Sequence, residues 1–385
     1  MTADRYTLWG TPHSLYTGKA RSYLIKKQIA FDDRLANDPR FMGEIVPSIG
    51  HFVAPVIECP DGTIVQDTTA IIDHCEACHA EPVLQPAGGV QRVVAAILDA
   101  FGSNYMLPLA MHYRWSYRDR QDLFLRTEFA RAIPTSMPYE QRLSTAGKLM
   151  DRFSGFLPNL GVAPAVIPAM EESYAELLAA LEQHFQAYPY LLGGRPSIAD
   201  FGMMAPLYAH LARDPVPAFL MRTTAPNVAR WTERMNVAEI PDFDYADPGG
   251  DYPANDAIPE TLEALLKLVF AQWGPGLSAD FDQFNSWLST VADPVPGTLV
   301  SHDGSRSVHP HVGKITYPWR GVTMQRGSQP HALWQFARAQ DAARGLAGED
   351  AVRLAALLDR CGGSAIMQLT TNRRIERKNN VLVLG

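Results

Sequence analysis

The residues best placed to do chemistry open a helix that follows a tight hairpin. Pro60-Asp61-Gly62 is typical of a turn whose glycine adopts a positive φ, so we expect short strands over 54–58 and 63–66. Asp67 and Thr68 are suited to cap the helix that follows. The first amides of such a helix are unpaired donors at the positive end of its dipole. The sequence therefore predicts a carboxylate-binding site at this helix end.

This segment resembles the glutathione-binding half of the glutathione transferase family. The matching elements are a cis-proline before the third strand, here Pro55, and an acidic/hydroxyl pair that opens the next helix, here Asp67-Thr68. The resemblance implies that Ala54, just before Pro55, offers its backbone amide and carbonyl to the cysteinyl part of glutathione. Asp67 and Thr68, with Gln66 beside them, are then expected to hold the γ-glutamyl end. Many family members have Glu-Ser here, so Asp-Thr is a mild departure.

The loop after the first strand is the second feature that bears on chemistry. In the family this loop holds the group that touches the glutathione sulfur, in a pattern that ends with an arginine, here Arg21. Counting back from Arg21 puts Ser14 at the first hydroxyl position and Thr17 at the second. A hydroxyl donor and the positive end of a helix both favour the thiolate, and they lower the thiol pKa from about 8.5 towards neutrality. The thiolate is the nucleophile, so this activation is the catalytic contribution expected of the protein.

The sequence leaves open which hydroxyl acts. Ser14 and Thr17 are the favoured candidates, and Tyr16 and Thr11 are the alternatives. No cysteine lies in this loop, which disfavours the thiol-transfer classes that form a mixed disulfide with glutathione. An ordinary noncatalytic loop is the remaining alternative, because the fold also occurs in noncatalytic proteins.

A dense group of aromatic and soft side chains marks a candidate site for an electrophile. The group comprises Tyr105, Met106, Tyr113 and Trp115, with Tyr117 nearby, at the start of the expected helical domain. Such side chains can hold a flat apolar substrate. They serve equally well as contacts between core helices, and both interpretations stay open.

Two motifs have a spacing that invites a haem or metal interpretation. Cys75-x-x-Cys78-His79 has the pattern of a c-type haem attachment site. It falls within the helix after Asp67, on the face of two isoleucines, where core packing accounts for the cysteines. His309-Pro310-His311 has no nearby carboxylate to complete a ligand set. We therefore expect glutathione as a co-substrate, without metal or haem, and a solvated or dimer-contacting role for the basic cluster at 373–378.

Composition narrows the functional classes further. The formal net charge of −7 disfavours nonspecific binding to nucleic acid or anionic membranes. No uninterrupted apolar run approaches the roughly 18–20 residues that span a bilayer, and the N-terminus lacks the apolar core of a secretory signal. Four cysteines in 385 residues fit a reducing compartment. The expected location is the cytoplasm, without nucleic-acid or membrane partners.

The elements around these sites predict an α/β thioredoxin-like domain at residues 1–82. Its expected order is β-α-β, a loop, then β-β-α, as in glutathione transferases. In the first helix, expected over 17–28, the apolar side chains share one face. We expect the lysines of this helix to point largely outward. They are Lys19, Lys26 and Lys27.

An all-helical domain is expected at residues 91–240, and an extension of unknown role at 257–385. In the helical domain Ser197 and Asp200 form a capping box that resembles the buried capping motif of the family. A connection over 242–256 leads to the extension, which we expect to be mostly helical. Its helices are predicted near 258–272, 279–290, 330–346 and 349–361.

The favoured interpretation is a cytoplasmic glutathione S-transferase that acts in detoxification. Ser14 is expected to stabilise a glutathione thiolate, which attacks a hydrophobic electrophile. The resemblance also implies a homodimer. Two alternatives are a glutathione-dependent lyase, reductive dehalogenase or ether-cleaving enzyme, and a noncatalytic binding or interaction protein that kept the fold.

Overall fold

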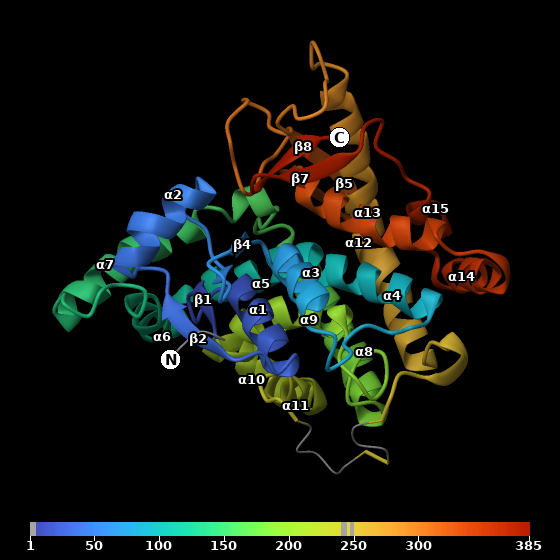
Figure 1. Cartoon of the computed structure of the whole chain (residues 1–385), viewed down its shortest axis with the longest axis horizontal. Helices are drawn as coiled ribbons and strands as arrows, with labels where there is room; N and C mark the ends of the chain where they lie inside the picture. Colours follow the sequence, from blue (N-terminus) through green and yellow to red (C-terminus); the bar gives the residue numbers. More distant parts are fainter. Residues whose placement is uncertain (1–4, 240–244, 247–249) are drawn as a thin grey trace.

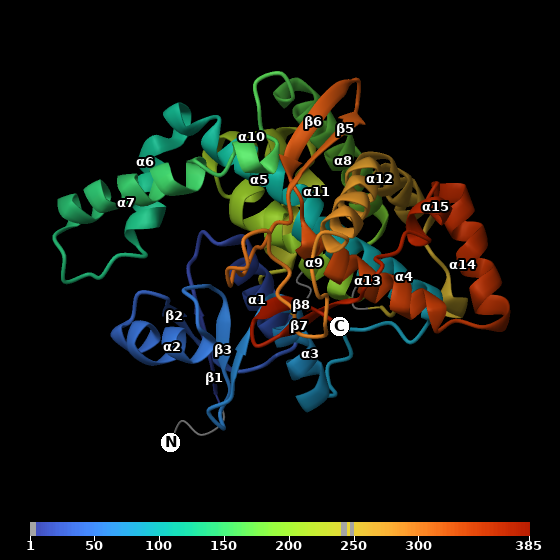
Figure 2. The same ribbon diagram turned by 90° about the horizontal axis from the view of Figure 1, so that it is seen from above.

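The computed structural model describes residues 5–239, 245–246 and 250–385. Figures 1 and 2 show a small sheet with its helices near the N-terminus, a bundle of helices beside it, and a C-terminal extension, orange and red, that lies against both. The connection predicted over 242–256 falls partly outside the described residues.

The N-terminal unit is built on a four-stranded sheet with the order β2-β1-β3-β4. Strand β1 pairs in parallel with β2 and antiparallel with β3, and β3 pairs antiparallel with β4. This confirms the predicted thioredoxin-like order. The bounds are β1 Tyr6–Gly10, α1 Leu15–Lys26, β2 Phe31–Leu35, η1 Phe41–Ile45, α2 Val46–Ile49, β3 Val56–Glu58, β4 Ile64–Gln66 and α3 Thr68–Cys78.

The helical domain starts with a continuous helical run, Gly89–Trp115, which comprises α4, η2 and α5. By length and composition this run could cross a membrane, but 83% of its most apolar window is buried inside the protein, as in a core helix. The bounds in this domain are α4 Gly89–Ala100, η2 Phe101–Tyr105, α5 Met106–Trp115, α6 Arg118–Ala130, α7 Tyr139–Ser154, η3 Pro158–Leu160, α8 Ile167–Ala187, α9 Ile198–Pro206, η4 Leu207–Ala212, α10 Pro215–Thr224 and α11 Pro226–Arg234.

The predicted capping box is present at the start of α9. The Ser197 hydroxyl accepts the Ala199 amide at 3.3 Å, and the Asp200 carboxylate accepts the Ser197 amide at 2.9 Å. Asp200 also accepts the Leu191 amide at 3.0 Å and the Trp231 indole N–H at 3.2 Å. Burial raises the pKa of Asp200 to about 6, against the effect of these donors. The Asp200 carboxylate therefore links helix α11 to the turn that precedes α9.

Helix α1 is covered on both sides, and this overturns one prediction. The three lysines expected to point outward are buried, namely Lys19, Lys26 and Lys27. The Lys19 ammonium lies 2.5 Å from the Asp99 carboxylate of α4. Lys26 donates to the Tyr190 hydroxyl at 2.7 Å. The prediction was wrong because α9 packs on a helix face that the sequence pattern assigned to solvent.

The extension begins with one long helix where the sequence predicted two. Helix α12 spans Glu260–Leu288 and contains Pro275, between two glycines. A proline removes one helical hydrogen bond and crowds the preceding turn. The β5-β6 hairpin packs against this part of the helix, where the Trp319 indole donates to the Gln272 carbonyl at 2.8 Å and Arg326 donates to the Gly276 carbonyl at 3.3 Å. The two-helix prediction was wrong because tertiary contacts outweigh the local helix breakers.

The rest of the extension combines helices with two hairpins. The helices predicted at 330–346 and 349–361 are present as α13 and α14, whereas neither hairpin was predicted. The bounds are η5 Ala254–Asp256, β5 Lys314–Trp319, β6 Val322–Gly327, α13 Pro330–Arg344, α14 Gly348–Cys361, α15 Ser364–Met367, β7 Ile375–Lys378 and β8 Val381–Leu384.

A buried ion pair joins the first hairpin to α12. Arg326 of β6 donates to both carboxylate oxygens of Asp280, at 3.1 and 2.7 Å, and the side chains are 5% and 0% exposed. The Gln329 amide donates to the same carboxylate at 2.8 Å. Removing one partner would leave a buried charge without compensation.

We predict that Asp280→Ala lowers the free energy of unfolding by about 3–5 kcal/mol. The measurement is urea denaturation followed by circular dichroism. Arg5→Ala is the control, because the Arg5–Asp32 pair is 48% and 44% exposed and should contribute about 0–1 kcal/mol. Equal losses for the two variants would contradict the prediction.

Candidate active site

The pairing register of the sheet brings three predicted segments to one edge. Trp9 of β1 is paired with Val56 of β3, and Val56 with Gln66 of β4. The β1–α1 loop, the segment just before β3 and the start of α3 therefore leave the sheet beside one another. These are the segments that the sequence assigned to the sulfur, the cysteinyl part and the γ-glutamyl end of glutathione.

The last two segments have the predicted backbone geometry. The peptide bond between Ala54 and Pro55 is cis. Asp67 caps α3, and its side chain accepts the Thr69 amide at 2.8 Å. Its φ of 85° lies in a region that L-residues rarely adopt. Strained residues of this kind persist where the surroundings fix them, and they cluster at ligand sites.

Ser14 is the N-cap of α1. Its hydroxyl oxygen accepts the Thr17 amide at 3.3 Å, and the residue is half-buried. Because a hydroxyl accepts and donates at once, this contact leaves the Ser14 O–H free to donate to another group. The positive end of α1 lies at the same place and also favours an anion.

Burial and hydrogen bonding distinguish the other candidate hydroxyl groups from Ser14. Thr17 is fully buried, and its hydroxyl oxygen accepts the Thr11 amide at 3.4 Å, so it shapes the loop without facing a ligand. Tyr16 donates to the Ser103 carbonyl at 3.0 Å, and burial raises its pKa. Thr11 and Ser14 stay partly exposed. Of these two, Ser14 is the one at the helix start.

The aromatic group predicted to bind an electrophile lies mainly in the helical core. Met106, Tyr113 and Trp115 are buried. Tyr105 is half-buried, and its hydroxyl lies 2.9 Å from the Ser173 hydroxyl. Of the two interpretations of this group, helix packing is the one that the structure supports.

The cysteine–histidine motif of α3 is divided between core and surface. Cys75 is buried as predicted, whereas Cys78 is exposed, so the prediction that core packing accounts for both cysteines was wrong for Cys78. His74 lies 3.8 Å from the Cys78 sulfur, and His79 lies 2.9 Å from the Tyr6 hydroxyl. Among the residues that the structure describes, no group of three or more His, Cys, Asp or Glu side chains is arranged to hold a metal ion.

The extension reaches the start of α3, which the sequence did not predict. His331 of α13 places its Nε2 3.3 Å from the Asp67 carboxylate. Arg377 of β7 donates to the Gln66 side-chain oxygen, and its Nε lies 4.0 Å from Asp67. The Asp67 and Arg377 side chains are each 12% exposed. The proposed γ-glutamyl end of the groove is therefore covered by the chain itself.

Opposite charges face each other where the extension meets the start of α3. Burial alone would raise the pKa of Asp67, but the His331 hydrogen bond, the Arg377 charge and a backbone amide outweigh it and hold the pKa well below its usual range. Burial lowers the pKa of Arg377, and Asp67 opposes that shift. His309 stacks against Tyr16 at 6.2 Å, and burial, with His331 nearby, lowers its pKa to about 4. An ionised Asp67 thus faces the Arg377 guanidinium and the His331 imidazole of the extension.

A local signal for the position of Arg377 does exist in the sequence. Asn379-Asn380 lies between Ile375–Lys378 and the apolar run Val381–Leu384, and both asparagines adopt positive φ, at 49° and 64°. Two such residues form the favoured turn of a tight hairpin. The alternation of a strand then puts Arg377 on the same side as buried Ile375. The prediction that this basic cluster is solvated or contacts a dimer partner was therefore wrong for Arg377.

Comparison with known families supports the family resemblance. Residues 164–234 match the family model described as Glutathione S-transferase, C-terminal domain. This segment is therefore similar to the C-terminal domain of glutathione S-transferases. Together with the thioredoxin-like sheet unit, it confirms the predicted fold of a glutathione S-transferase followed by an extension.

Solved structures of low identity are similar over about two thirds of the chain. A glutathione S-transferase from Methylobacterium radiotolerans, in complex with glutathione sulfonate, is 17% identical over 66% of this chain and 100% of its own, with a TM-score of 0.35. The glutathione transferase GSTFuA3 from Phanerochaete chrysosporium is 16% identical over 62% and 98%, with a TM-score of 0.41. The beta-etherase LigF from Sphingobium is 16% identical over 60% and 94%, with a TM-score of 0.37. A search of curated proteins gave no match.

The loop that carries Ser14 gives a stability prediction. A Cβ at Gly10 would lie 2.3 Å from the Thr17 methyl carbon and 2.6 Å from its hydroxyl oxygen. We predict that Gly10→Ala lowers the free energy of unfolding by about 1–3 kcal/mol through overpacking. In a Thr17→Ala background the added cost should fall well below that, because the crowded atoms are gone. Urea denaturation of the four proteins measures this coupling, and additive losses would rule out the contact as the cause.

Proposed function

We propose that the protein is a glutathione-dependent transferase in which Ser14 stabilises the glutathione thiolate. The observation that carries this proposal is the register Trp9–Val56–Gln66, which sets the Ser14 loop, Ala54 and the start of α3 along one edge of the sheet. A homodimer, a cytoplasmic location and a role in detoxification belong to the same proposal.

The groups at this edge match the parts of glutathione in order. Asp67 is ionised and suits the ammonium of the γ-glutamyl end, while the first amides of α3 suit its carboxylate. Ala54 offers its backbone to the cysteinyl part. The Ser14 hydroxyl then donates to the sulfur and lowers the thiol pKa, with help from the dipole of α1.

The chemical step follows from the thiolate. Its sulfur forms a bond to the electrophilic carbon of a hydrophobic compound, and the bonding pair to the leaving group departs with that group. The aromatic side chains predicted for this compound lie mainly in the core. Tyr105 and the nearby Tyr117 keep some exposure and are the ones available to contact such a compound.

The test is glutathione binding by calorimetry, with the pKa of the bound thiol followed by thiolate absorbance. Wild type should bind glutathione and lower the thiol pKa. In Ser14→Ala the pKa of the bound thiol should rise by about 1–2, because one hydrogen bond to a charged group contributes about 1.5–3 kcal/mol.

Thr11→Val is the matched control in the same loop. It removes the other partly exposed hydroxyl and should leave the thiol pKa unchanged. A rise in Thr11→Val but not in Ser14→Ala would move the role to Thr11. Failure of wild type to bind glutathione would overturn the proposal.

A second candidate function is favoured by the extension contact. His331 and Arg377 already engage Asp67 and Gln66, which are the groups proposed for the γ-glutamyl end. A noncatalytic protein that keeps the fold while its own chain fills the groove would have this geometry. In that case wild type would not bind glutathione.

The His331→Ala/Arg377→Ala double variant separates the two functions. If the extension fills the groove in place of glutathione, the double variant should bind glutathione at least tenfold more tightly than wild type, because Asp67 is released. Lys378→Ala is the control, since Lys378 lies on the same strand, is exposed, and pairs with Glu376. Unchanged or weaker binding in the double variant would contradict the noncatalytic function and would favour a groove that works with its extension in place.

A further inference from the structure

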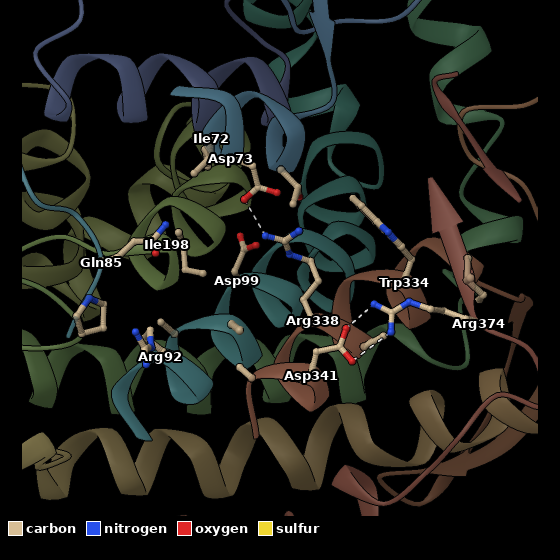
Figure 3. Close-up of a pocket in the computed structure, with 17 residues that line it drawn as sticks. Ile72, Asp73, Gln85, Arg92, Asp99, Ile198, Trp334, Arg338, Asp341 and Arg374 are labelled. Carbon is tan, nitrogen blue, oxygen red and sulfur yellow. Dashed lines mark hydrogen bonds and ion pairs between the residues drawn. The ribbon is translucent and has the colours of Figure 1, made fainter. Parts of the chain in front are cut away.

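Ion pairs link the sheet unit to the rest of the chain both at the surface and in the interior. Figure 3 shows one at the surface, where Arg338 of α13 donates to Asp73 of α3 at 2.8 Å. Both side chains are exposed, and such pairs contribute little to stability. The pair of Arg114 and Asp214 is different, because its side chains are 3% and 0% exposed. It lies next to the loop that carries Ser14.

Arg114 of α5 has an acceptor for each of its N–H groups. Its Nε and one terminal nitrogen donate to the two carboxylate oxygens of Asp214, at 2.6 and 2.9 Å. The same terminal nitrogen donates to the Ala209 carbonyl at 2.9 Å. The other donates to the His13 carbonyl at 2.9 Å and to His210 Nε2 at 2.6 Å. A guanidinium has five N–H donors in a fixed plane, so these contacts determine its position.

The two histidines near Arg114 are neutral. Burial and the Arg114 charge lower the pKa of His210 well below its ordinary value, so its Nε2 can accept a hydrogen bond. Burial and the nearby arginines lower the pKa of His13 to about 3. The His13 ring stacks on Phe129 of α6, with ring centroids 4.1 Å apart. The residue just before Ser14 is therefore fixed by both its side chain and its carbonyl.

A second arginine holds the preceding carbonyl of the loop. Arg213 donates to the Pro12 carbonyl, and it donates to the Glu128 carboxylate at 2.5 Å. Within the loop, the Ser14 amide donates to the Thr11 carbonyl at 3.2 Å. The backbone that leads into Ser14 is thus attached to the helical domain at two consecutive carbonyls.

We propose that Arg114 is a positioning residue for thiolate activation, which acts by holding the backbone of the Ser14 loop. This inference rests on the proposed function, in which the Ser14 hydroxyl donates to the glutathione sulfur. The direction of that hydroxyl depends on the backbone that precedes it, and a hydrogen bond weakens steeply as its angle closes. Because Asp214 compensates the charge of Arg114 locally, the effect on the sulfur passes through Ser14.

The test is the pKa of bound glutathione in Arg114→Lys, followed by thiolate absorbance. Lysine keeps a positive charge beside Asp214 but lacks the planar fork that reaches several acceptors at once. The thiol pKa should rise by about 0.5–1, less than in Ser14→Ala, because a displaced hydroxyl keeps part of its hydrogen bond. In Ser14→Ala/Arg114→Lys it should rise no further than in Ser14→Ala alone, since both residues act through one hydroxyl.

S-methylglutathione distinguishes positioning from a general structural role. It has no ionisable thiol, and its γ-glutamyl end is expected at Asp67, on a different segment. Its Kd, measured by calorimetry, should change less than about twofold in Arg114→Lys. A loss of affinity of about tenfold or more would mean that Arg114 supports the whole groove, and would overturn the inference.

A second variant keeps the test decisive if Arg114→Lys does not fold. Arg114→Met/Asp214→Asn removes both charges, so that neither is left buried without its partner. It should raise the thiol pKa in the same way. Arg326→Met/Asp280→Asn is the matched control, because that Arg–Asp pair of the extension is similarly buried, at 5% and 0% exposed. The control should leave the thiol pKa unchanged.

The outcomes distinguish this inference from the proposed function. If Ser14→Ala raises the thiol pKa while both Arg114 variants match wild type, the inference alone is overturned. A further rise on adding Arg114→Lys to Ser14→Ala would also overturn it, because Arg114 would then act by another route. If wild type does not lower the thiol pKa, or Ser14→Ala does not raise it, the proposed role of Ser14 fails and the inference fails with it.

Discussion

The burial of α1 between the sheet and the helical domain is the constraint on which the rest of the structure depends. A helix covered on both sides cannot keep three lysines unless each finds a partner. Lys19 pairs with Asp99 across the domain boundary, and Lys27 lies 2.9 Å from Glu76. Burial and a neighbouring arginine lower the pKa of Lys26 to about 7. Any tilt of α1 would separate these buried side chains from their partners and leave their charges uncompensated. Ser14, at the start of α1, is therefore held in place.

Local rules account for what could be predicted from the sequence. The turn at Gly62, the cap at Asp67 and the Ser197 capping box each depend on residues within a few positions of one another. Predictions failed where the deciding partner was remote. The pattern of α1 could not reveal that a second domain covers Lys19, and the sequence around Pro275 could not show that a hairpin donates hydrogen bonds to that part of α12.

The candidate site divides in the same way. The positions of Ser14, Ala54 and Asp67 relative to one another follow from short strands and their turns, so sequence reasoning found them. The choice among the loop hydroxyls needed burial, which shows that Thr17 faces inward. Arg377 had a local hairpin signal, but its partner Gln66 is 311 residues away. A local sequence pattern can predict a hairpin, but it does not indicate which distant surface the hairpin packs against.

That separation has a consequence for how the protein is made. At about 5–20 residues per second, a ribosome reaches Arg377 roughly 15–60 seconds after it has passed Gln66. For most of that interval the residues of the sheet unit have been made but the side chains that contact Asp67 have not, because His331 follows Asp67 by 264 residues and Arg377 comes later still. The groove of the nascent chain therefore lacks its cover until the residues around His331 and Arg377 emerge.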